Sequence, residues 1–321
     1  ELESNIEVAL KRLSTDTPPV DSTSFPAMMD VSTSSLELVS LLLMVIAGGI
    51  LATEFGTGTV KLLLITPHRR SKIFWSKALL LLELILITSG AQQVMDLLTK
   101  SLCNEGDVVI CEAPSFIGSL NTFRSFNARL RGIPMESDGM NIASLEQALK
   151  EEPRAKFIYT IPNFQNPSGI TMSLEKRRAV YDLAKKYQVL VLEDNPYGDL
   201  RFHGEYIPCI KSLDEEGIVV YAGTFSKVLS PGIRVGYAIG PAALLKKMIV
   251  CKQGEDVHTG ILSQMICERF MAAYDYEAHL KALQDLYRER ARAMCRYIDE
   301  YLAPAGVTYQ PVTGGLFVWC T

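Results

Sequence analysis

The sequence predicts an α/β fold in which helices cover both faces of a mainly parallel sheet. From Ile87 onward, short apolar runs alternate with amphipathic segments of helical length, which is the element order of α/β proteins. Apolar runs of this length are typical of parallel strands that are buried on both faces. A chain of 321 residues that is 48% hydrophobic has enough apolar side chains for such a core.

The elements are predicted from the period and length of each apolar pattern. Leu174–Tyr187 illustrates a helix, with Lys and Arg on its exposed face, and Val189–Glu193 illustrates an apolar strand. A strand pair is expected within Val307–Cys320, around Gly314-Gly315. The predicted order before it is helix Ala91–Cys103, strand Val108–Cys111, helices Ile117–Phe126 and Ser144–Glu151, strand Phe157–Ile161, helix Leu174–Tyr187, strands Val189–Glu193, Val219–Ala222 and Val235–Ile239, and helix Tyr276–Tyr301.

Residues 1–86 differ in composition and are predicted to form a separate segment. The apolar stretch Leu36–Ala52 is interrupted only by Glu37 and Ser40. At about 17 residues it is near the lower limit for crossing a bilayer, so one membrane helix is predicted over residues 36–53. Basic residues follow it, which favours a cytoplasmic position for the next segment. Membrane contact is therefore expected only through residues 36–87.

Composition excludes several classes of function. The net charge of −4 gives no basic surface for nucleic acid. The seven cysteines form no Cys-x-x-Cys pair and the four histidines no i, i+4 pair, so no metal site is expected. The N-terminus is polar and acidic and lacks the basic start of a secretory signal. These features predict a cytoplasmic protein in a reducing compartment.

Thr88-Ser89-Gly90-Ala91-Gln92 opens the first predicted helix. Small residues at a helix N-terminus let backbone N–H groups approach an anion, and the helix dipole favours negative charge there. This motif is a candidate phosphate site. The alternative is an ordinary helix start, with Ser89 as the capping residue.

Asn163-Phe164-Gln165-Asn166-Pro167-Ser168-Gly169 follows the strand Phe157–Ile161. A Pro-Ser-Gly sequence after a strand is typical of a simple turn. Alternatively, the amide of Asn166 points at an oxygen atom of a cofactor.

Glu193-Asp194-Asn195-Pro196-Tyr197 directly follows the apolar strand that ends at Leu192. A carboxylate at the end of a buried strand needs a partner, because burying it alone is costly. A protonated pyridine nitrogen is one candidate partner for Asp194. A metal ion or a helix N-terminus is the other.

Thr224-Phe225-Ser226-Lys227 and Ser230-Pro231-Gly232-Ile233-Arg234 follow the strand that ends at Ala222. A lysine enclosed after an apolar strand is a candidate amine nucleophile, because enclosure disfavours its charged form. Thr224, Ser226 and Arg234 are candidate phosphate ligands. The alternative for Lys227 is an ordinary surface lysine.

The four motifs together, in this order and spacing, resemble the fold-type I pyridoxal-5′-phosphate (PLP) enzymes, specifically the class I/II aminotransferases. The resemblance covers residues 87–321. It implies a PLP-binding large domain over residues 87–302 and the start of a truncated small domain over 303–321. The segment KQGEDVHTG, Lys252–Gly260, further resembles the branch that contains 2-aminoadipate and kynurenine aminotransferases.

The resemblance also implies a role for each site residue. Lys227 corresponds to the lysine that holds PLP covalently and Asp194 to the partner of the pyridine nitrogen, and both are candidate catalytic residues together with Tyr197. Asn166 and Tyr197 are expected at the phenolic oxygen of the cofactor, and Phe116 against its ring. The residues expected around the phosphate are Ser89, Gly90, Ala91, Gln92, Thr224, Ser226 and Arg234.

Residues 36–86 resemble a different family, the permeases of ABC transporters. The residues that carry this second resemblance are Glu54, Gly58, Thr59, Pro67, Arg70 and Lys77. Because the junction near Leu84–Thr88 lies within a continuous apolar run, we expect a truncated or artificially joined reading frame rather than a natural membrane-anchored enzyme.

The predicted function is transfer of an amino group between an amino acid and a 2-oxo acid, by a family that normally acts as a homodimer. The arginine that binds the substrate carboxylate in the family lies beyond Thr321, so weak activity is expected. Three alternatives stay open: a permease fragment with a passenger domain, the effector domain of a transcription regulator, and another PLP chemistry such as elimination or decarboxylation.

Overall fold

A computed structural model describes residues 83–321 of the chain. These residues all belong to one compact unit, Arg69–Thr321. The predicted membrane helix over residues 36–53 lies outside the described part. Within residues 83–321, no helix has the length and apolar character needed to cross a bilayer.

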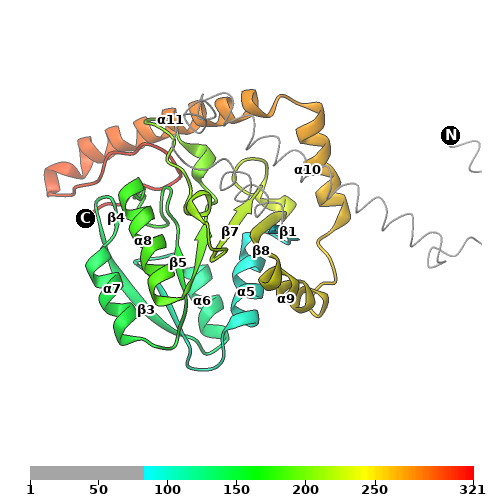
Figure 1. The fold of residues 1–321 in the computed structure, drawn as a ribbon. Helices are drawn as coiled ribbons and strands as arrows, with labels where there is room; N and C mark the ends of the chain where they lie inside the picture. Colours follow the sequence, from blue (N-terminus) through cyan, green and yellow to red (C-terminus); the bar gives the residue numbers. More distant parts are fainter. Residues whose placement is uncertain (1–82) are drawn as a thin grey trace, which may run out of the picture. The chain divides into compact units, whose positions relative to one another are not determined.

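An eight-stranded sheet forms the centre of the unit, in the order β1-β8-β7-β6-β5-β2-β3-β4 (Figure 1). The five strands from β3 to β7 in this order run parallel, whereas β8, β1 and β4 each pair antiparallel with their neighbours. The predicted fold class is therefore confirmed. The strands are β1 Glu83–Thr88, β2 Val108–Ala113, β3 Arg129–Glu136, β4 Gly139–Met140, β5 Ala155–Thr160, β6 Leu190–Asp194, β7 Val219–Thr224 and β8 Gly236–Pro241.

Helices cover both faces of the sheet, and Figure 1 shows α11 as a long helix across the top of the view. Helices α5, α6 and α9 share one buried cluster with the sheet, while α7 and α8 share another on the opposite face. The helices are α5 Ala91–Leu102, α6 Ile117–Ser125, α7 Ile142–Glu151, α8 Leu174–Tyr187, α9 Ala242–Gln253, α10 Ile261–Ala273 and α11 Tyr276–Tyr301.

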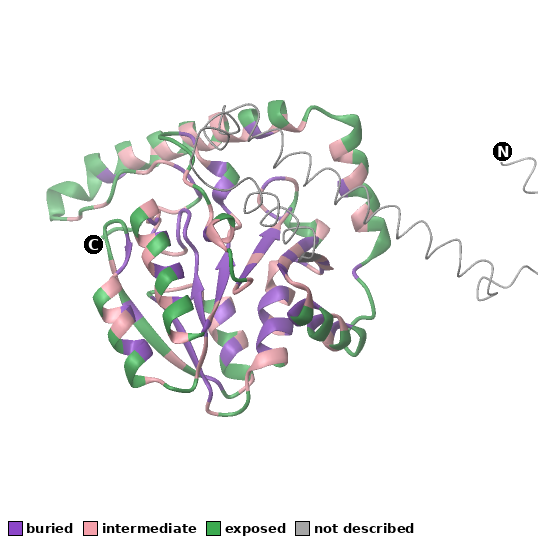
Figure 2. Ribbon diagram, viewed as in Figure 1, coloured by how far each residue is buried: buried purple, intermediate pink, exposed green. Residues whose placement is uncertain are grey.

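Successive residues of the central strands enter opposite clusters. In β2, Val109 and Cys111 pack on the α5 side, and Val108 and Ile110 pack on the α7–α8 side. Both faces are therefore apolar, and the strand has a continuous apolar sequence. Figure 2 shows the buried central strands between partly exposed helices.

Caps explain why the ends of α8 coincide with the prediction. The hydroxyl of Ser173 accepts a hydrogen bond from the N–H of Lys176 at the start of the helix. At the other end, Gln188 adopts the left-handed conformation, with φ of 53°, which ends the helix.

Several elements differ from the prediction. Strands β1, β3 and β4 and helices α9 and α10 were not predicted. The strand pair predicted within Val307–Cys320 is reduced to one antiparallel bridge between its ends, Tyr309 with Cys320, while Gly314 bridges Arg201 instead. The reason is that the backbone beside these glycines pairs with another segment: the Gly315 N–H donates to the Leu200 carbonyl, and the Thr313 carbonyl accepts from the N–H groups of Phe202 and His203.

Candidate active site

The predicted site residues gather at one edge of the sheet. Strands β1, β2, β5, β6 and β7 point in the same direction, so their carboxyl ends meet at this edge. Ser89, Phe116, Asn166, Asp194 and Lys227 each lie at or soon after the end of one of these strands. This is the edge at which open α/β sheets bind ligands.

Asp194 is the last residue of β6 and is 4% exposed. Its Oδ2 accepts a hydrogen bond of 2.8 Å from the hydroxyl of Tyr159, but Oδ1 has no hydrogen-bond partner among residues 83–321. Burial raises the pKa of Asp194 to about 7. A buried acceptor without a partner is costly, so this carboxyl group suits a ligand that brings a positive N–H group.

Tyr159 was missed by sequence reasoning. It lies within β5, beside β6 in the sheet, and is fully buried. Burial raises the pKa of its hydroxyl well above the ordinary value, so the hydroxyl stays a donor. The sequence feature that could have indicated this role is a tyrosine within a buried strand, because a buried hydroxyl needs a hydrogen-bond partner.

Arg234 belongs to a second group of polar residues at this edge of the sheet, together with Ser89, Thr224 and Ser226. Its guanidinium donates hydrogen bonds of 3.3 Å to the carbonyl of Ser89 and to the hydroxyl of Ser226. The hydroxyl of Thr224 lies 3.0 Å from the same Ser226 oxygen. These donors, next to the N-terminus of α5, suit an anion such as a phosphate group.

Gly90 brings the start of α5 against Arg234. Its φ is 84°, and a Cβ at this position would lie 2.2 Å from Nη2 of Arg234. Gly90, and not Ser89, is the N-cap residue, so the alternative role of Ser89 as a helix cap was wrong. Among the described residues, no side chain caps α5, which leaves its first N–H groups to other acceptors.

The side chains of Ser89 and Gln92 have partners within the protein. Ser89 donates a hydrogen bond of 2.9 Å to Asp256, in the segment Lys252–Gly260. Gln92 donates to the Thr122 hydroxyl at 2.6 Å and so ties α5 to α6. The backbone of Ala91 packs tightly against Gly236, whose Cβ would lie 2.6 Å from the Ala91 nitrogen. Thus the backbone of Ala91 and Gln92 borders the polar residues around Arg234, whereas the side-chain amide of Gln92 is directed at α6.

The side chains of Asn166 and Tyr197 lie within hydrogen-bond reach of each other. Burial raises the pKa of the Tyr197 hydroxyl to about 12, and a hydrogen bond with the Asn166 side chain opposes part of this rise. The Tyr197 ring packs edge-on against Phe317, with ring centroids 5.4 Å apart. Phe116 directly precedes α6, is half-buried and packs against the buried cluster on the α5 side of the sheet.

Lys227 follows β7 by three residues and is half-buried, less enclosed than the sequence predicted. Its flanking residues hold the backbone in place: Phe225 and Val228 enter a buried cluster with Leu280 of α11. His279 also contacts the carbonyl of Val228 at 2.7 Å.

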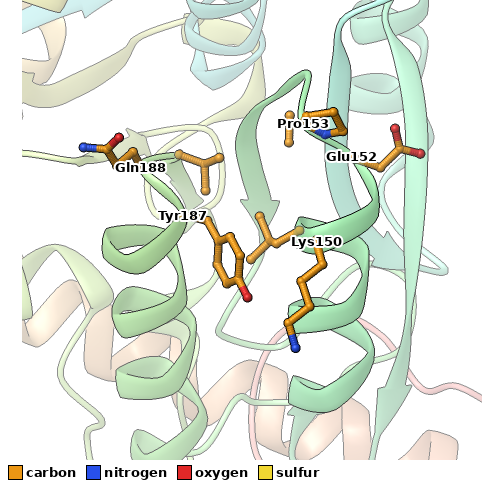
Figure 3. A pocket seen from close by; sticks show the side chains of 8 residues that line it. Lys150, Glu152, Pro153, Tyr187 and Gln188 are labelled. Atoms are coloured by element: carbon orange, nitrogen blue, oxygen red, sulfur yellow. The ribbon is translucent and has the colours of Figure 1, made fainter.

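A surface hollow lies elsewhere and has none of this chemistry (Figure 3). Its lining includes Lys150, Pro153 and Tyr187, around the amino-terminal ends of β5 and β6. It is therefore at the opposite edge of the sheet from Asp194. Within residues 83–321, no three His, Cys, Asp or Glu side chains are grouped to hold a metal ion.

Two family models match the chain. Residues 79–321 match the model described as "Aminotransferase class I and II". Residues 14–105 match a model described as a protein of unknown function, DUF2705. The resemblance of residues 36–86 to ABC-transporter permeases is therefore not supported.

Curated relatives and solved structures resemble the same part of the chain. Aromatic-amino-acid aminotransferase 1 of Thermococcus litoralis is 39% identical over 241 residues, which are 74% of this chain and 58% of the relative. The 2-aminoadipate transaminase of Thermus thermophilus is 38% identical over 74% of this chain and 60% of its own length. Kynurenine aminotransferase of Pyrococcus horikoshii, solved with PMP and kynurenine, has a TM-score of 0.72 at 38% identity and covers 75% of this chain and 60% of its own. This chain thus spans less than two thirds of each of these proteins.

Proposed function

The chain belongs to the class I and II aminotransferase family, and on this basis we propose that it binds PLP and transfers amino groups between an amino acid and a 2-oxo acid. The observation that carries the proposal is the Oδ1 atom of Asp194, a buried acceptor with no partner among the described residues. A protonated pyridine nitrogen would supply the missing donor and a compensating positive charge.

The described residues fit each part of PLP. Arg234, Ser226 and the open start of α5 suit its phosphate group. Asp194 suits the ring nitrogen, while Asn166 and Tyr197 suit the phenolic oxygen on the ring. We assign Phe116 to the face of the ring, because it follows β2 at the same edge of the sheet. Ala91 and Gln92 contribute through the helix backbone.

Lys227 is assigned two roles. Its amine would hold PLP covalently, and the Nζ atom, once released from PLP, would accept the proton from the substrate Cα. PLP, when bound, supplies an electron sink for the charge that develops at Cα. Asp194 stabilises the positive ring nitrogen that receives this charge. Tyr197 holds the phenolic oxygen and so fixes the orientation of the ring.

The finer assignments are also proposals. Relatives are named for aromatic amino acids, 2-aminoadipate and kynurenine, which supports an amino acid with a long or aromatic side chain as the donor. A homodimer and a cytoplasmic location accord with the family. The match to the aminotransferase family does not favour the transport or regulator alternatives.

Titration of the 321-residue chain with PLP tests the proposal. We expect saturable binding with a visible absorbance band, which Lys227→Ala abolishes. Lys246→Ala, an exposed lysine on α9, is the matched control and should bind as the parent does. Amino acids are then screened for conversion of the band to that of pyridoxamine phosphate. Equal bands in both lysine variants would contradict the assignment of Lys227.

A further inference from the structure

Glu112 is a buried carboxyl group beyond the residues assigned above. It lies near the end of β2 and is 1% exposed. Its Oε1 accepts a hydrogen bond of 2.5 Å from the hydroxyl of Thr160, and the N–H of Ile161 lies within 3.3 Å of both oxygens. Its Oε2 accepts a hydrogen bond of 3.0 Å from the side-chain amide of Gln165. Glu112 thus joins β2 to the segment that follows β5.

Gln165 extends this connection in two directions. Its Nε2 also donates to the carbonyl of Pro114 at 2.7 Å, and its Oε1 accepts from the N–H and hydroxyl of Ser168 at 2.8 and 2.6 Å. The amide cannot be reversed, since its oxygen would then face the Pro114 carbonyl and its nitrogen the Ser168 N–H. The Gln165 side chain is fully buried, so water could not satisfy its amide group in the reversed orientation.

These contacts fix two loops that meet at the candidate site. Asn166 directly follows Gln165 within the closed loop Phe164–Gly169, and Phe116 lies two residues after Pro114. We propose that Glu112 is a positioning residue, which sets the places of Asn166 and Phe116 through Gln165. This inference rests on the proposed function, because those two residues are the ones assigned to the phenolic oxygen and the face of the PLP ring.

A carboxylate meets this requirement better than other side chains. All three neighbours are donors, and above its pKa the Glu112 carboxylate is an acceptor at both oxygens. Glutamine in place of Glu112 would carry one NH₂ group. In one orientation this group would face the NH₂ group of Gln165, and in the other it would face the donors of Thr160 and Ile161. Burial raises the pKa of Glu112 to about 7, and hydrogen bonds from Thr160, Gln165 and Ile161 oppose that rise. Hydrogen bonds to an ionised carboxylate are stronger than those to a neutral group, and burial strengthens them further.

A double-mutant cycle tests the proposal with the full 321-residue chain and PLP as the probe. Glu112→Gln should weaken PLP binding about tenfold, the effect of one lost charge-assisted hydrogen bond. In an Asn166→Ala background, the same change should weaken binding by only about threefold or less, because part of its effect passes through Asn166. Equal effects in the two backgrounds, or no effect in either, would overturn the proposal.

Glu193→Gln is the matched control. Glu193 is equally buried at the end of β6, but it accepts from the N–H groups of Ile210 and Lys211 and does not contact the Gln165 loop. Its substitution should have the same small effect on PLP binding with and without Asn166. If it couples to Asn166 as strongly as Glu112 does, the effect is general loosening of the fold and the proposal fails.

Amide hydrogen exchange without PLP separates this proposal from the proposed function. Glu112→Gln should speed exchange of the Ser168 and Gly169 amides about tenfold, and Glu193→Gln should act on Ile210 and Lys211 instead. Unchanged exchange in the loop would refute the role of Glu112 even if PLP binds. Failure of the parent chain to bind PLP would instead refute the proposed function. Gln165→Met, which removes the same connection, serves if Glu112→Gln does not fold.

Discussion

The hydroxyl of Tyr159 occupies one oxygen of the Asp194 carboxyl group, at 2.8 Å, and leaves the other oxygen without a partner among residues 83–321. The two residues lie on the adjacent parallel strands β5 and β6. Tyr159 thereby stabilises the ionised form of Asp194 from one side, and the site retains an acceptor on the other.

Tyr159→Phe should weaken both the fold and the binding of PLP. The lost hydrogen bond to a buried carboxyl group is expected to lower the free energy of unfolding by about 1–3 kcal/mol. The pKa of Asp194 should rise further, because the Tyr159 hydrogen bond opposes the effect of burial. Urea unfolding and a PLP titration measure the two effects. Tyr187→Phe removes a 3.2 Å contact with Glu146 and is the control, which should leave PLP affinity unchanged.

The stability of the PLP-free chain should depend on pH through Asp194. Its pKa is about 7 in the folded protein, above the value of about 3.9 of an unfolded aspartate. The folded state therefore binds the Asp194 proton more tightly than the unfolded state does. The stabilisation that this proton gives the fold is complete below about pH 4 and is lost as the pH rises to about 7. For one proton the slope is at most ~1.4 kcal/mol per pH unit.

Asp194→Asn isolates that contribution. Its unfolding free energy should fall less steeply between pH 4 and 7 than that of the parent chain. Some slope should remain, because burial also raises the pKa of Glu112 to about 7. A parent and variant with identical pH profiles would show that Asp194 does not titrate in this range.

Gly90→Ala should disrupt the proposed phosphate site. Its Cβ would lie 2.2 Å from Arg234, so the guanidinium must move in addition to the strain of a φ of 84°. We expect PLP affinity to fall by about tenfold or more, as for loss of a charge-assisted contact. Gly306→Ala is the control, since its φ is 94° and no atom lies within 4 Å of the added Cβ. It should lose a similar amount of stability without loss of PLP affinity.

The sequence predicted the elements whose patterns are local. Helix α8 was predicted to both ends, because its amphipathic pattern coincides with the cap at Ser173. Strand β3 was missed, since Arg129, Arg131 and Pro134 break its apolar pattern and most of its residues are exposed. Helix α9 was missed because its sequence, AALLKKMIVCKQ, shows little separation of apolar and polar faces.

The site was predictable only in part, for a similar reason. Asp194, Asn166, Arg234 and Lys227 lie in short motifs with a fixed order, and the structure brings these motifs to one edge of the sheet. Tyr159 gains its role only when β5 pairs with β6. In the same way, the contact of Glu112 with the Gln165 loop depends on the pairing of β2 with β5. Such pairings join residues that are far apart in the sequence.

The most direct test is to locate the site of PLP attachment. The 321-residue chain is incubated with PLP, reduced with borohydride, digested and analysed by peptide mass spectrometry. We expect a stable phosphopyridoxyl group on Lys227 alone, and a much weaker signal in Asp194→Asn. A label spread over surface lysines such as Lys246, or an unlabelled Lys227, would contradict it.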